Sequence, residues 1–131
     1  QQDVPEDFVV ATGITTSVRD FIIMAFREVG IEIEFSGKEE NEKATVKACN
    51  NPEYQLPIGQ EVVSIDKKYY RPAEVELLIG DPAKAKEKLG WVPKYDLAAI
   101  VKEMVAADVD LFKRDKYLKE GGHTVINYHE Q

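Results

Sequence analysis

The sequence predicts a small mixed α/β domain in which a few short strands are packed by about three helices. One observation behind this prediction is a strand–helix–strand pattern in the opening part of the chain, with short connections between the elements. A second is a pair of later helical stretches, each introduced by an aspartate of the kind that caps a helix. The opening pattern favours a right-handed βαβ crossover, and hence a sheet that is partly parallel.

The opening elements follow from local residue patterns. Residues 8–12 are apolar and rich in β-branched side chains, which is typical of a buried strand. Ser17 is the expected N-cap of a helix, because Asp20 three residues later completes a weak capping box, and Gly30 ends that helix. Residues 31–36 alternate apolar and polar side chains, which predicts a half-exposed strand. The helix has one apolar face, made of Val18, Phe21, Ile22, Ala25, Phe26 and Val29.

The middle of the chain, residues 37–60, is charged, contains prolines and shows no sustained period. We therefore expect a long loop there, and loops of such length are either functional or simple surface excursions. Residues 61–66, with three β-branched apolar side chains, predict a short strand after the loop.

Two helices are predicted in the last part of the chain. Asp81 is the expected cap of the first, with Pro82 at its first helical position, and Gly90 ends it. Asp96 caps a long final helix with one apolar face, which a pair of glycines ends. In the tail, residues 119–131, a candidate edge strand contains Val125, Ile126 and Tyr128.

Length and charge limit the kinds of protein to consider. The 131 residues fit one domain. The net charge is −7 and the positive residues are scattered, whereas a nucleic-acid partner needs a basic face, so none is expected. No apolar run approaches the roughly 20 residues that span a bilayer, so no membrane partner is expected either.

Cys49 is the only cysteine of the sequence, so no disulfide can form within the chain. A lone thiol in a polar stretch suits a reducing compartment, and we expect a cytoplasmic protein. The sequence opens on Gln1 and not on methionine, from which we expect it to be a piece of a longer protein.

Familiar catalytic patterns are missing from the sequence. There is no glycine-rich dinucleotide fingerprint, no phosphate-binding loop and no tyrosine followed four residues later by lysine. The histidines, His123 and His129, both lie in the tail without a nearby cysteine, which is a poor pattern for a metal site. We therefore assign no catalytic, cofactor-binding or metal-binding residue to this chain.

Arg71 is the exception among the charged residues. Pro72 restricts the backbone of Arg71 to extended geometry, and a guanidinium group suits the paired oxygens of a phosphate. Glu74 follows three residues later, and its carboxylate can accept hydrogen bonds from sugar hydroxyls. The pair could thus hold the diphosphate and ribose of a nucleotide. Spacing alone favours a plain surface ion pair between the two side chains.

A longer pattern reverses that preference. The stretches "EDFVVATGITTSVRDFIIMAFREVGIEIEFSGK", "NEK", "YYRPAEVELLIGDPAKAKEKLGWVPK" and "AAIVKEMVAADVDL" resemble, in this order, the C-terminal third of the GDP-mannose 4,6-dehydratases. That family belongs to the extended short-chain dehydrogenase/reductases. The resemblance covers most of residues 5–112, and the run from Arg71 to Trp91 is its most specific part. The stretch "ACNNPEYQLPIG" departs from it as an insertion.

The resemblance implies a fold and an activity. Intact members carry an N-terminal Rossmann domain that holds NADP and the catalytic residues, which would lie upstream of Gln1. They oxidise C4 of GDP-mannose, eliminate water across C5–C6 and return the hydride to C6. The product, GDP-4-dehydro-6-deoxy-D-mannose, is a precursor of GDP-fucose and GDP-rhamnose. Residues 1–131 would form the C-terminal substrate-binding region, with Arg71 on the diphosphate and Glu74 on the ribose.

On this basis the partners are GDP-mannose and the Rossmann domain of the same protein, and the intact enzyme would be a homodimer or homotetramer. The chain would be inactive alone. Two alternatives stay open: a free-standing nucleotide-sugar or protein-binding module without catalysis, and a related nucleotide-sugar dehydratase or epimerase with a different substrate.

Overall fold

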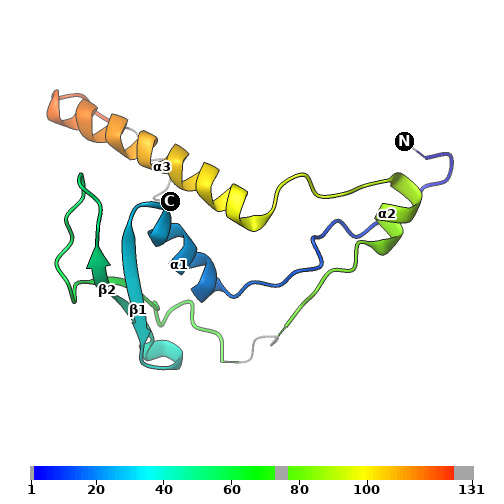
Figure 1. The fold of residues 1–131 in the computed structure, drawn as a ribbon, viewed down its shortest axis with the longest axis horizontal. Coiled ribbons are helices and arrows are strands. Elements are labelled where there is room, and N and C mark those ends of the chain that lie inside the picture. The colour runs from blue at the N-terminus through cyan, green and yellow to red at the C-terminus, as the bar shows by residue number, and fades with distance from the viewer. Residues whose placement is uncertain (1, 73–76, 126–131) are drawn as a thin grey trace.

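The computed structural model describes residues 2–72 and 77–125 and confirms the predicted mixture of a few short strands and helices (Figure 1). The elements, in chain order, are α1 (Val18–Glu28), β1 (Ile31–Ser36), the 3₁₀ helix η1 (Glu39–Asn41), β2 (Lys43–Cys49), β3 (Glu61–Ser64), α2 (Ala83–Leu89) and α3 (Leu97–Glu120).

The sheet is antiparallel throughout its described strands, in the order β1-β2-β3, so the predicted parallel pairing is wrong. Ile33 pairs with Val46 and Phe35 with Ala44. The connection between β1 and β2 is short and contains η1, and a connection of that length can only join antiparallel strands.

Residues 8–12 are not a strand, which removes the predicted βαβ crossover. They run extended beside Gly80, where an added Cβ would lie 2.6 Å from the Cβ of Ala11. Val9 and Val10 remain 52% and 63% exposed. Their β-branched side chains fit a strand. Within the described residues, however, residues 8–12 form no ladder of backbone hydrogen bonds with a neighbouring segment, and a strand requires one.

The predicted loop over residues 37–60 is also wrong in its first half, where β2 forms the centre of the sheet. Ala44 and Val46 are buried while Lys43 and Lys47 are exposed, which is the two-residue alternation of a half-buried strand. Small alanine side chains make this alternation weak in the sequence. The loop is confined to residues 50–60, and the strand predicted after it is present as β3.

The predicted helix ends are close to those observed. The Ser17 hydroxyl accepts a hydrogen bond from the backbone N–H of Asp20, and Asp96 does the same for Ala99 at 2.8 Å. Helix α2 begins one residue later than predicted: Pro82 is its cap, while the Asp81 carboxylate accepts from the N–H of Ala83 at 2.9 Å. Gly90 and Gly121 follow the last turns of α2 and α3, as expected.

The core lies between α1 and the sheet. Four residues of β1 and β2 form its buried centre, and apolar side chains of α1 pack against them. On its other side α1 contacts α3, whose Val101 is buried. The central residues are Ile31, Ile33, Ala44 and Val46.

Helix α2 lies at the opposite end of the molecule from the sheet, connected to it by extended segments (Figure 1). Glu6 holds the N-terminal segment against this helix, because its carboxylate accepts from Lys88 at 2.7 Å and lies 2.9 Å from Lys84. The hydrogen bonds from Lys88 and then Lys84 lower the pKa of Glu6 to about 2. Among the described helices, none has the length and hydrophobicity needed to cross a membrane. The predicted tail strand is absent up to Val125, and its remaining residues lie outside the described part.

Candidate functional site

Arg71 lies beside a hollow of about 670 Å³ on the segment that leaves β3 (green in Figure 1, between the sheet and α2). We refer to this space as the Arg71 hollow. Its wall combines the first residue of α1 with five residues of the segment after β3, so two elements far apart in the sequence meet there. The lining residues are Val18, Ile65, Lys68, Tyr69, Tyr70 and Arg71.

A tight turn determines where the side chains of this wall lie. The side-chain carboxylate of Asp66 accepts a hydrogen bond from the N–H of Lys68 at 2.9 Å. The backbone carbonyl of Asp66 accepts another from the N–H of Tyr69 at 3.0 Å. An aspartate that bonds the backbone two residues on is a common way to fix such a turn. The turn brings the Lys68 ammonium group to 5.2 Å from the centroid of the Tyr69 ring, a cation–π distance.

Of the two predicted site residues, the structure describes Arg71 and not Glu74, which lies outside the described residues. Their proximity therefore stays a prediction. Sequence reasoning did not single out Lys68, Tyr69 and Tyr70 as site residues, although they line the same hollow. The signal that could have found them is the density of cations and aromatic rings in the run "KKYYR".

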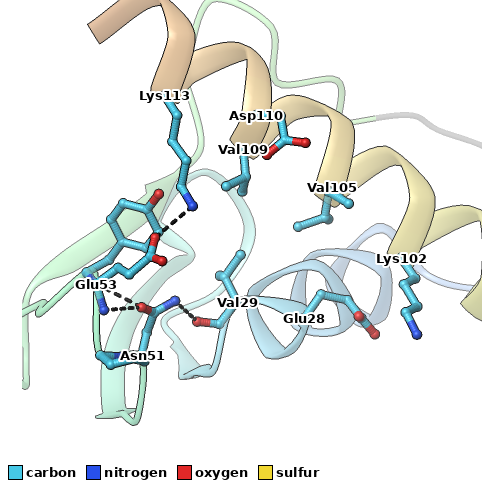
Figure 2. Close-up of a pocket in the computed structure, with 12 residues that line it drawn as sticks. Glu28, Val29, Asn51, Glu53, Lys102, Val105, Val109, Asp110 and Lys113 are labelled. Carbon is cyan, nitrogen blue, oxygen red and sulfur yellow. Dashed lines mark hydrogen bonds and ion pairs between the residues drawn. The ribbon is translucent and has the colours of Figure 1, made fainter. Parts of the chain in front are cut away.

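A second space, of about 420 Å³, lies between the end of α1, the start of the β2–β3 loop and the middle of α3 (Figure 2). Its floor is apolar and includes Val29, Val105 and Val109. Charged groups of both signs surround the floor, with Glu28, Glu53, Lys102, Asp110 and Lys113 among them.

Asn51 organises the loop side of this pocket (Figure 2). Its side-chain amide donates to the carbonyl of Val29 at 2.6 Å, and its side-chain oxygen accepts from the N–H groups of Glu53 and Tyr54. The Cys49 thiol donates to the carbonyl of Tyr54 at 2.9 Å. The thiol and the amide are thus both used to shape the loop.

Two charged groups of the same pocket, Lys113 and Glu53, form an ion pair. Lys113 lies 2.7 Å from the Glu53 carboxylate, and this hydrogen bond lowers the pKa of Glu53 and raises the pKa of Lys113. An ion pair of that kind is a structural attachment, since neither group is poised to exchange a proton near neutral pH. Within the described residues, no three His, Cys, Asp or Glu side chains gather as a metal site would require.

Comparison with known sequences decides the family. The sequence model of the family described as "GDP-mannose 4,6 dehydratase" matches residues 1–104, which is most of the chain. The chain belongs to the GDP-mannose 4,6-dehydratase family.

Individual family members agree with this assignment. The GDP-mannose 4,6-dehydratase of Yersinia enterocolitica is 51% identical over 127 residues, which cover 95% of this chain and 34% of the relative. The corresponding protein of Dictyostelium discoideum is 47% identical over 118 residues, covering 89% of this chain and 31% of the relative. The human GDP-mannose 4,6 dehydratase is 45% identical over 113 residues, which cover 86% of this chain and 28% of the relative. The chain thus spans about a third of the length of these relatives.

The two spaces relate differently to the family match. The Arg71 hollow lies wholly inside residues 1–104. The pocket of Figure 2 crosses its boundary, because Val105, Val109 and Lys113 follow the last matched residue. The family match therefore favours the Arg71 hollow over the pocket of Figure 2 as the candidate functional site.

Proposed function

We propose that this chain is the C-terminal, substrate-binding part of a GDP-mannose 4,6-dehydratase that converts GDP-mannose to GDP-4-dehydro-6-deoxy-D-mannose. In this proposal Arg71 contacts the diphosphate and Glu74 the ribose of GDP. The observation that carries the proposal is the place of Arg71 on the wall of a hollow within the residues that match the family. Because the matched relatives are about three times as long, the rest of the enzyme would supply the catalytic residues.

The residues of this chain do not fit the cofactor. Dinucleotides bind at a glycine-rich turn between a strand and a helix, and here α1 follows an extended segment without that turn. NADP is therefore assigned, as part of the proposal, to the Rossmann domain of the intact enzyme, and no step of the reaction is assigned to this chain. Its task would be to bind and orient the sugar nucleotide.

The setting of the enzyme is also proposed. A reduced cytoplasm suits the free thiol of Cys49, whose hydrogen bond to Tyr54 would be lost on oxidation. The intact enzyme would be a homodimer or homotetramer, in line with the apolar side chains that α3 leaves exposed, such as Met104 and Phe112.

The test is Arg71→Ala in the intact enzyme. We expect GDP-mannose binding to weaken by about 1.5–3 kcal/mol, the range for a hydrogen bond to a charged group, while NADP binding is unchanged. Titration calorimetry measures both. Arg114→Ala is the matched control, because Arg114 is an exposed arginine of α3 outside the family match. An unaltered affinity for GDP-mannose in Arg71→Ala would overturn the diphosphate role.

A second measurement concerns the chain by itself. Residues 1–131, supplied with NADP and GDP-mannose, should form no 4-keto sugar. Detection of that product would show that catalysis resides in this chain, contrary to the proposal.

A further inference from the structure

The described lining of the Arg71 hollow is cationic on a negatively charged protein. The chain as a whole carries −7, yet among the described residues that line the hollow two are cations and none is an acid. Such a local reversal of charge suits an anion. The volume of about 670 Å³ lies within the range of about 300–1,000 Å³ that small-molecule sites occupy.

The second cation, Lys68, is held in place from two sides. Asp66 fixes its backbone through the turn described above, and the face of the Tyr69 ring lies 5.2 Å from its ammonium group. Tyr69 itself is 71% exposed, so its ring serves as a support at the surface and not as core. A lysine whose ammonium group is held over an aromatic ring has fewer conformations to lose when it binds a ligand.

The neighbouring lysine behaves differently. Lys67 is next in the chain, but its ammonium group lies 3.5 Å from the Glu40 carboxylate of η1, and it does not line the hollow. The two neighbouring lysines of the turn therefore have different roles. Lys67 attaches the turn to η1, and Lys68 lines the hollow on the same wall as Arg71.

The wall also has an apolar side. Val18 and Ile65 line the hollow together with the half-buried Tyr70. Two cations beside apolar and aromatic surface match the two chemical halves of a nucleoside diphosphate, which are a charged diphosphate and a flat base whose faces stack on aromatic side chains.

We propose that Lys68, positioned by the ring of Tyr69, is a second cation for the diphosphate of the bound sugar nucleotide, acting together with Arg71. This inference rests on the proposed function and adds a residue to it. Because the diphosphate carries charge on both phosphates, two cations on one wall would make the site select a nucleoside diphosphate over the nucleoside alone.

The experiment measures selectivity in the intact enzyme. Dissociation constants for GDP and for guanosine are obtained by competition with a fluorescent GDP derivative. In Lys68→Met we expect the preference for GDP over guanosine to fall about tenfold, since guanosine has no phosphate for Lys68 to contact. Lys68→Arg should restore most of the preference because it restores the charge. Lys67→Met is the control and should leave the preference within about twofold.

The role of the ring is tested separately. Tyr69→Leu removes the surface on which Lys68 rests and should reduce the preference for GDP about threefold, whereas Tyr69→Phe keeps the ring and should have no effect. If Lys68→Met weakened GDP and guanosine equally, Lys68 would be a structural residue and the inference would be wrong.

The outcomes also separate this inference from the proposed function. If Arg71→Ala weakens GDP binding and Lys68→Met does not, the second cation is refuted while the proposed function stands. If the unaltered enzyme does not bind GDP, the proposed function fails and the inference fails with it.

Discussion

The ammonium group of Lys113 in α3 lies 2.7 Å from the carboxylate of Glu53, in the loop that joins β2 to β3. The same ammonium group is 5.7 Å from the centroid of the Tyr54 ring. Two consecutive residues of the loop, Glu53 and Tyr54, thus both interact with Lys113 of α3. Lys113 is therefore the residue of α3 that attaches this loop.

We expect Lys113→Met to loosen the loop without unfolding the domain. The variant removes both the ion pair and the cation–π contact, while Asn51 still holds the start of the loop through the carbonyl of Val29. Hydrogen exchange at the backbone of residues 53–60 should become faster, and exchange in the sheet should not change.

Lys116→Met is the matched control for that experiment. Lys116 lies one turn further along α3 and is 3.9 Å from Glu120, a pair within the helix that does not involve the loop. Loop exchange that is the same in Lys113→Met as in the unaltered chain would show that the ion pair contributes nothing to the attachment.

The elements that the sequence predicted well are those decided by neighbouring residues. Ser17 and Asp96 cap their helices through hydrogen bonds to residues three positions away, so their partners are visible in the sequence. Strand β2 was missed because its identity depends on β1 and β3 as partners on either side. Residues 8–12 were assigned wrongly for the same reason, since propensity cannot supply a ladder.

The candidate site shows the same division. Pro72 and the family pattern mark Arg71 in the sequence as a candidate site residue, and its binding role stays a prediction. Lys68 and Lys67 look equivalent there, and the turn built by Asp66 decides which of them lines the hollow. A one-residue difference in direction around a turn depends on backbone geometry that composition and spacing do not encode.

Glu6 predicts a pH dependence for the attachment of the N-terminal segment to α2. Its pKa is lowered from 4.5 to about 2 by hydrogen bonds from Lys88 and Lys84. A carboxylate with a lowered pKa in the folded state stabilises that state above its unfolded pKa, and the contribution is lost as the pH falls through the folded pKa. The attachment should therefore be complete above pH 4.5 and lost by about pH 2.

Glu6→Gln tests this dependence. At pH 7 the variant should show faster hydrogen exchange in α2 than the unaltered chain. The two should converge as the pH approaches 2, because Glu6 of the unaltered chain then becomes protonated and, like glutamine, carries no charge to pair with the lysines. Glu87→Gln is the control, because it removes a carboxylate of α2 that does not contact the N-terminal segment in the described structure. A constant difference between Glu6→Gln and the unaltered chain from pH 7 to 2 would contradict the assignment.

Val46→Ala tests the finding that residues 43–49 are a central strand. Val46 is 1% exposed and packs with Ile31 and Ile33 against α1. Truncation of a side chain in such a place removes buried apolar area and leaves a small cavity, which together cost about 1–3 kcal/mol of the free energy of unfolding. Urea denaturation followed by circular dichroism measures this loss. Val92→Ala is the control, because Val92 is 56% exposed and its truncation should cost little. If Val46→Ala were as mild as Val92→Ala, residues 43–49 would have to lie outside the core, as the long loop predicted from the sequence would have placed them.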